Sequence, residues 1–310
     1  MRIVVALGGN ALRRDGEPLT VETRRAAVAA ACAVLAPVAE AHELVISYGA
    51  GPQAGQLSMQ APAHDAASIH RLDVLDAQSE WAIGYLIEQE LGNLLPAEAP
   101  LATVLTMTEV DPDDPAIANP TTFVGPAHRA GRAHRIAEER GWVFQQDGDS
   151  WRRVVPSLQP RRIVEIRPVE WLLARGCVVI CAGGGGMPTM NARGAHTTVG
   201  VEAVVDKDCA SAVLAQQLGA DLLVIASDVD AVYLDWGTPA QRGIARAHPD
   251  VLDPRCFPPG SMGPKIEAAA HFARASSRSA VIGSLQHLPA ILAGEDGTQI
   301  TVHVEGLEVR

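Results

Sequence analysis

Lysine is nearly absent from this chain. Only Lys207 and Lys265 occur among its 310 residues, and the other 23 basic side chains are arginine. A chain that uses arginine for ordinary positive charge retains lysine where a compact ammonium on a flexible stem is needed, because a planar guanidinium fork does not fit such a place. The alternative is that the composition drifted from lysine towards arginine and that these two lysines remained by chance. Both lysines lie in motifs with glycine or aspartate, and this favours a chemical role.

Other scarcities exclude whole classes of protein. Only 4% of the residues are aromatic although 47% are hydrophobic, which indicates an aliphatic core of the kind that buried parallel strands form. A formal net charge of -11 argues against nucleic-acid binding. No apolar run approaches the ~20 residues of a membrane span, and the apolar start before Gly8 is too short for a signal peptide.

Cysteine is also scarce, and its five copies show no paired spacing. Cys177 and Cys181 share one face of an apolar run, where buried thiols are expected rather than metal ligands. We therefore expect a reducing, cytoplasmic compartment.

Short aliphatic runs alternate with alanine-rich helical stretches, which predicts βαβ units and a mainly parallel sheet with helices on both faces. Helices are expected at 20–36, ended by Pro37, and at 72–91. Strands are expected at 2–7, 44–47, 103–107, 177–181, 222–226, 279–282 and 299–302.

Residues 111–162 break this alternation. The segment is rich in proline, aspartate, arginine and histidine, and it is too long for a plain loop. It predicts an inserted flap subdomain.

Three glycine-rich turns follow three of the predicted strands: Gly8-Gly9-Asn10, Gly49-Ala50-Gly51, and Gly183 to Gly186. Glycine lets backbone amides approach an anion, and the carboxyl ends of parallel strands are where such sheets bind ligands. Tight turns that merely use glycine are the alternative. Neither the P-loop motif nor a correctly placed G-x-G-x-x-G motif is present.

Each lysine lies at a predicted helix start. Asp206-Lys207-Asp208 is typical of a phosphate-neutralising ammonium with a neighbouring acid, although a capping aspartate beside a solvated lysine has the same pattern. Lys265 follows Gly260-Ser261-Met262-Gly263-Pro264 and lies in a first helical turn, where the helix dipole disfavours a cation unless it faces an anion. The segment 227–233, which carries Ser227, Asp228, Asp230 and Tyr233, is compatible with a nucleoside or magnesium-bound water, and equally with a plain turn.

Together these segments resemble the amino-acid-kinase superfamily, and within it the carbamate kinases. Matching stretches are Val-Val-Ala-Leu-Gly-Gly-Asn-Ala-Leu at 4–12, Gly-x-Gly-Pro-Gln-x-Gly at 49–55, Ile-Gly-Tyr at 83–85, Thr-Val-Leu-Thr at 103–106, Asn-Pro-Thr at 119–121, Gly-Pro at 125–126, Trp-Arg-Arg-Val-Val-Pro-Ser at 151–157, the four-glycine run, Gly-Val-Glu-Ala-Val-Val-Asp-Lys-Asp at 200–208 and Pro-Gly-Ser-Met-Gly-Pro-Lys-Ile-Glu-Ala at 259–268. They run from end to end in the right order.

The resemblance implies a three-layer αβα fold, Mg²⁺ with ATP or ADP as cofactors, a small acid acceptor such as carbamate, and a homodimer. It implies an acceptor lobe at 1–200 that includes the flap, and a nucleotide lobe at 201–310. It implies that Lys207, Asp206, Asp208, Lys265, Gly8, Gly9 and Asn10 are catalytic, that Gly49, Ala50, Gly51, Gly184 and Gly185 bind the acceptor, and that Ser227, Asp228, Asp230, Tyr233, Gly260, Ser261, Met262 and Lys265 bind the nucleotide. Asp208 rather than Asp206 is the expected organiser of the lysines.

The departures from the family gather on the acceptor side. Tyr48 replaces histidine, Glu80 and Trp81 replace glutamine and glycine, and Thr122 stands where the family has a flap lysine. Three interpretations follow: a carbamate kinase, a kinase for another small carboxylate or phosphonate with a pocket reshaped by Glu80 and Trp81, or an inactive nucleotide-binding homologue. Replacement charges in the flap are His128, Arg129, Arg132, His134 and Arg135, with a solvated helix face as the alternative.

Overall fold

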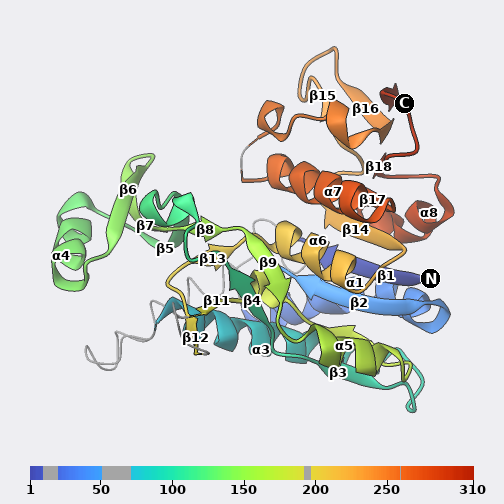
Figure 1. Cartoon of the computed structure of the whole chain (residues 1–310), viewed down its shortest axis with the longest axis horizontal. Coiled ribbons are helices and arrows are strands. Elements are labelled where there is room, and N and C mark those ends of the chain that lie inside the picture. The colour runs from blue at the N-terminus through green and yellow to red at the C-terminus, as the bar shows by residue number, and fades with distance from the viewer. Residues whose placement is uncertain (10–19, 51–70, 192–196, 259) are drawn as a thin grey trace.

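The computed structural model describes residues 1–9, 20–50, 71–191, 197–258 and 260–310. Its centre is a ten-stranded sheet in the order β15-β16-β18-β17-β14-β1-β2-β10-β3, with β19 paired to β16 (Figure 1). The bounds are β1 Arg2–Leu7, β2 Glu43–Tyr48, β3 Leu101–Thr103, β10 Val178–Ile180, β14 Leu222–Ser227, β15 Tyr233–Leu234, β16 Arg242–Ala247, β17 Ser279–Ser284, β18 Thr298–Ile300 and β19 Leu307–Val309. The six strands from β17 to β3 are all parallel to one another.

Helices cover both faces of this sheet, because its strands are apolar on both sides. Ile3, Val5 and Leu7 of β1 pack in one core with helices α1, α3 and α8, whereas Val4 packs in the other core with α5, α6 and α7. The helices are α1 Val21–Ala41, α3 Leu72–Gly92, α5 Ile166–Leu173, α6 Lys207–Gln217, α7 Met262–Ser276 and α8 Leu288–Ala293. The predicted three-layer αβα fold is confirmed. Cys177 and Cys181 are both buried in the second core, as expected.

Three smaller sheets extend from the central layer. One is β12-β11-β4-β9, another is the pair β13-β8, and the third is β5-β7-β6, which projects with α4 at the left of Figure 1. Their bounds are β4 Met107–Val110, β5 Thr122–His128, α4 Ala130–Arg140, β6 Val143–Asp147, β7 Ser150–Val155, β8 Ser157–Leu158, β9 Pro160–Ile163, β11 Met187–Asn191, β12 Thr198–Gly200 and β13 Val204–Val205.

Helix α1 corrects the prediction that Pro37 ends it. The helix continues to Ala41, and the exposed Pro37 lies between the buried Ala36 and Val38. Proline removes one backbone hydrogen bond from a helix interior, but packing of the neighbouring residues against the sheet holds the last turn in place.

The predicted strand at 103–107 is two strands. Thr103 ends β3 in the central sheet, and Met107 begins β4 in the β12-β11-β4-β9 sheet. Between them, the hydroxyl of Thr106 donates to the Val104 carbonyl and accepts from the amide of Ala182. An aliphatic run gives no sign that its two ends pair with different partners. The last predicted strand, 299–302, is also displaced, because β18 ends at Ile300.

Candidate functional site

The three glycine-rich turns lie at one edge of the sheet. They follow β1, β2 and β10, which are adjacent and parallel. A Cβ on Gly49 would lie 3.2 Å from the amide nitrogen of Gly9, and a Cβ on Gly184 would lie 3.1 Å from the Cβ of Ala50. The turns therefore touch one another, as the sequence predicted. Asn10 and Gly51, two predicted site residues, lie outside the described residues.

The amides of these turns divide into two groups. Those of Gly49 and Gly185 donate to the carbonyls of Leu7 and Ala182 at 3.1 and 3.2 Å, so they shape the turns. Gly8 and Gly9 line one cavity, whereas Gly49, Ala50 and Gly184 line another. Gly185, which was predicted to bind the acceptor, lines neither of these cavities and instead packs against the backbone of Val205. Its φ is +97°, and a Cβ there would lie 2.4 Å from the Val205 carbonyl oxygen.

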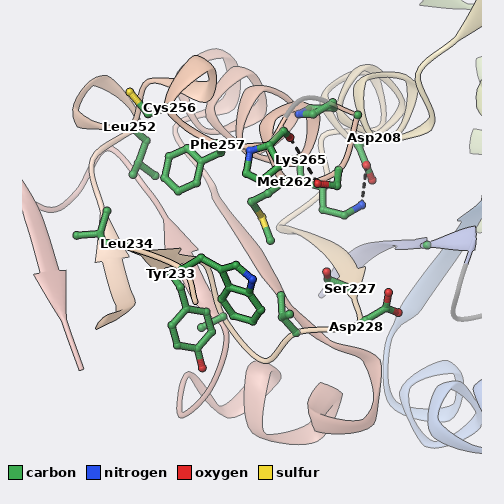
Figure 2. Close-up of a pocket in the computed structure, with 18 of the residues that line it drawn as sticks. Asp208, Ser227, Asp228, Tyr233, Leu234, Leu252, Cys256, Phe257, Met262 and Lys265 are labelled. Atoms are coloured by element: carbon green, nitrogen blue, oxygen red, sulfur yellow. Dashed lines mark hydrogen bonds and ion pairs between the residues drawn. The ribbon is translucent and has the colours of Figure 1, made fainter. Parts of the chain in front are cut away.

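The two lysines meet on one carboxylate. Nζ of Lys207 lies 2.5 Å from Oδ1 of Asp208. Nζ of Lys265 lies 2.9 Å from Oδ2 of the same carboxylate (Figure 2). Asp206 caps α6 by accepting from the amides of Asp208 and Cys209 at 2.9 and 3.0 Å, which fixes the turn that presents Lys207. The structure thus makes Asp208 the bridge between the lysines and Asp206 the helix cap.

Burial and charge compete at this bridge. The side chains of Lys207, Lys265 and Asp208 are 11%, 15% and 6% exposed. Burial by itself raises the pKa of Asp208, but the ammonium groups of Lys207 and Lys265 outweigh it, and the pKa is lowered. Burial lowers the pKa of Lys207, against the attraction of Asp208. The carboxylate is therefore ionised and holds both cations in place.

A cavity of about 940 Å³ opens on the Lys265 side of the bridge. Of the eight residues predicted to bind a nucleotide, all except Asp230 line it. Asp230 instead accepts a 2.7 Å hydrogen bond from the hydroxyl of Tyr233 and so positions that ring.

The same cavity has an apolar end that the sequence analysis missed. Figure 2 shows Leu252 and Phe257 across from Tyr233, with Ser227, Asp228 and Asp208 at the far, polar end. Trp236 also lines it, 5.2 Å from the Tyr233 ring. Tyr233 begins β15, whereas Trp236, Leu252 and Phe257 lie outside the strands, and no single stretch of sequence signals that these side chains share a cavity.

A second cavity of about 870 Å³ opens on the Lys207 side, between the turns and the projecting β5-β7-β6 sheet. Thr122 and His128 line it. Arg129, Arg132, His134 and Arg135 are exposed outside it, and for them the solvated helix face is the right interpretation.

Two arginines on β7 supply charge that the sequence analysis did not assign. Arg152 and Arg153 line the second cavity. Arg153 lies 3.8 Å over the Trp142 ring and pairs with Glu202 at 2.6 Å, and Arg152 pairs with Asp147 at 3.1 Å. The signal that could have found them was the Trp-Arg-Arg motif at the end of the predicted flap.

The structure gives no support to the interpretation that Glu80 and Trp81 reshape the pocket. Trp81 is 63% exposed and Glu80 is 1% exposed, and in the described part of the chain neither lines either of the two cavities. Glu80 accepts from the amides of Gly183 at 3.0 Å and Thr106 at 3.3 Å, and its carbonyl accepts from the hydroxyl of Tyr48 at 2.6 Å. Glu80 and Tyr48, two of the departures from the family, therefore help to hold the four-glycine turn in place.

Asp206 lines both cavities, and the bridge lies where they meet. A group carried from one cavity to the other passes two ammonium groups and the glycine turns. Such an arrangement stabilises negative charge in transit, which is what phosphoryl transfer requires.

Comparisons with known proteins agree with this geometry. The model of the Amino acid kinase family matches residues 1–284. Carbamate kinase of Rhizobium meliloti is 52% identical over 98% of this chain and 97% of its own, and carbamate kinase of Haemophilus influenzae is 52% identical over 99% of each. The structure of carbamate kinase from Giardia lamblia bound to AMP-PNP superposes with a TM-score of 0.90 at 34% identity, over 97% of this chain and 98% of that one.

Proposed function

The chain belongs to the amino acid kinase family, and from this premise we propose that it is an ATP-dependent carbamate kinase, which transfers a phosphoryl group between ATP or ADP and carbamate or carbamoyl phosphate. The observation that carries the proposal is the carboxylate of Asp208 holding Lys207 and Lys265 between two cavities. Full-length similarity to carbamate kinases at about half identity supports the same activity.

We propose that the first cavity binds the nucleotide and the second the acceptor, which corresponds to a nucleotide lobe at 201–310 and an acceptor lobe at 1–200 with the flap at 111–162. An AMP-PNP complex of a relative supports nucleotide binding. The apolar end with Tyr233 and Phe257 suits a base, and the end with Lys265 suits phosphates.

Between the cavities, Lys207 and Lys265 stabilise the charge on the transferring group, with the backbone of Gly8 and Gly9 beside it. Asp208 holds both ammonium groups at the place where the two cavities meet. Neither side of the transfer gains or loses a proton when carbamoyl phosphate and ADP become carbamate and ATP, so the site needs cations and amides rather than a general base.

Mg²⁺ fits the polar end of the nucleotide cavity. Asp206 and Asp228 line it, and their oxygens are the hard donors that Mg²⁺ prefers alongside phosphates and water. When bound, the ion neutralises phosphate charge; these two carboxylates are the residues that would hold it.

We further propose a homodimer formed through α3. Val74, Trp81 and Tyr85 lie on one helical face and are 43%, 63% and 56% exposed, an apolar stripe that a second copy would cover. Sedimentation velocity tests this, and Trp81→Glu is expected to shift the chain to a monomer.

Among the described residues no helix is long and apolar enough to cross a bilayer. We propose a reducing, cytoplasmic setting, which the five free thiols support.

The activity is tested by mixing the purified chain with carbamoyl phosphate and MgADP and measuring ATP. This direction avoids the instability of carbamate. ATP at ordinary enzymatic rates is expected. Nucleotide binding with no ATP formation would contradict the proposal, and turnover only with another acid would replace its substrate.

A further inference from the structure

An acidic side chain on α3 lines the acceptor cavity. Asp76 follows Leu72 by one helical turn, both line this cavity, and Asp76 is partly buried. Within the described ranges, no lysine or arginine pairs with it and no donor is bonded to its carboxyl. Phosphoryl transfer between carbamate and ATP needs no general base, so Asp76 acts on the acceptor through its charge.

The cations that line this cavity each contact a carboxylate other than Asp76, and Lys207 shares its partner Asp208 with Lys265. Lys207 lies 2.5 Å from Asp208, Arg153 lies 2.6 Å from Glu202, and Arg152 lies 3.1 Å from Asp147. Two further carboxylates, Asp206 and Glu267, line the same cavity, and Asp76 adds to their negative charge. When ionised, it makes the wall more negative towards an anionic acceptor.

The groups that face Asp76 favour its neutral form. On its own helix lies Asp73, which pairs with Arg71 at 3.1 Å, and from the loop after β12 comes Glu202, which also accepts from the amide of Leu72 at 2.7 Å. Burial first, then the charges of Asp73 and Glu202, raise the pKa of Asp76 to about 7. It thus changes charge near neutral pH.

We propose that Asp76 sets the affinity for the acceptor, admitting carbamate or carbamoyl phosphate when protonated and repelling them when ionised. The inference rests on the proposed function of this cavity. A protonated carboxyl can donate a hydrogen bond to an acceptor oxygen, whereas a carboxylate cannot. By linkage, binding of the anion raises proton occupancy of Asp76, so binding takes up a proton.

The test is the KM for carbamoyl phosphate between about pH 6 and about pH 9, in the unmodified chain and in Asp76→Asn. In the unmodified chain KM is expected to rise about tenfold across this range, while kcat and the KM for MgADP change little. The asparagine variant keeps the shape of the side chain without its charge, so its KM stays low and flat. Any titration of the substrate itself appears equally in both proteins.

Two control variants separate Asp76 from its surroundings. Glu109→Gln removes a carboxylate that pairs with Arg162 outside the cavity, and it should keep the pH profile of the unmodified chain. His128→Asn removes the histidine of the cavity, whose pKa is lowered by burial and by Arg132. It should also keep the rise in KM, since His128 loses its charge at lower pH.

A readout without turnover completes the test. Calorimetric titration with carbamoyl phosphate alone, in buffers of different ionisation enthalpy, should show proton uptake near neutral pH that Asp76→Asn abolishes. Equal uptake in the two proteins, or equal KM profiles, would overturn the role of Asp76. Failure of all forms to make ATP would instead count against the proposed function, while the calorimetry still decides the role of Asp76.

Discussion

Lys265 and Asp208 are 57 positions apart in the chain, yet Nζ of Lys265 donates a 2.9 Å hydrogen bond to Oδ2 of Asp208. The other oxygen of the same carboxylate accepts from Lys207 at 2.5 Å. Helices α6 and α7 are thus joined at their first turns by a buried charge cluster, and this cluster separates the two cavities.

Replacing Asp208 by asparagine should strongly lower kcat. The two ammonium groups would repel each other without the carboxylate, and we expect kcat to fall by about 10²–10³. A buried cation left without its partner should also cost roughly 3 kcal/mol of unfolding free energy. Steady-state kinetics and urea unfolding measure the two effects. Asp250→Asn, which removes an exposed partner of Arg274, is the matched control and should change neither.

Arginine should not replace either lysine. Lys207→Arg and Lys265→Arg keep the charge, but a planar guanidinium does not fit beside the buried Asp208, and we expect kcat to fall by about tenfold or more. The reverse change Arg246→Lys at an exposed ion pair should leave the rate unaltered. Full activity in both arginine variants would show that neither position requires lysine, and that the two lysines were not retained for a chemical reason.

Gly185 should tolerate no side chain. Its φ is +97° and a Cβ would lie 2.4 Å from the Val205 carbonyl oxygen, so Gly185→Ala adds a clash to backbone strain. Gly219 has φ +60° with open space around its Cβ position. Gly219→Ala therefore measures the backbone strain without a clash, which should lower the free energy of unfolding by about 1 kcal/mol. We expect Gly185→Ala to cost at least twice as much in urea unfolding and to raise the KM for carbamoyl phosphate. Equal costs would mean that the four-glycine turn has room to move.

Glu80 should make the fold less stable as pH rises. Burial raises its pKa from 4.5 to about 8. The folded chain therefore binds more protons than the unfolded chain between these values, so the free energy of unfolding falls as pH increases towards 8 and then levels. In Glu80→Gln this part of the pH dependence should vanish, whatever the change in absolute stability. Urea unfolding at a series of pH values measures it, and an unchanged slope in the variant would assign the dependence to other groups.

Several features could be predicted from local sequence because local physics sets them. The alternation of apolar and polar runs gave β1, β2 and β14, and the order of strands and helices predicted the layered sheet. Asp206 marked the start of α6 because a capping carboxylate has a recognisable position before a helix.

Other features depended on packing that no local pattern contains. Pro37 ends a helix by intrinsic propensity, but burial of its neighbours keeps α1 intact. Glu80 and Trp81 are consecutive, and only the tertiary structure shows that one supports Gly183 while the other faces outward.

The sequence by itself determined the kind of fold, the family and the two lysines, because propensity, periodicity and motif order act over short stretches of chain. The tertiary structure alone decided that both lysines share Asp208, that Arg152 and Arg153 line the second cavity, and that Asp76 lies near the carboxylates of Asp73 and Glu202. Such relationships are distances and fields between residues far apart in the chain, and they exist only once the cores have closed.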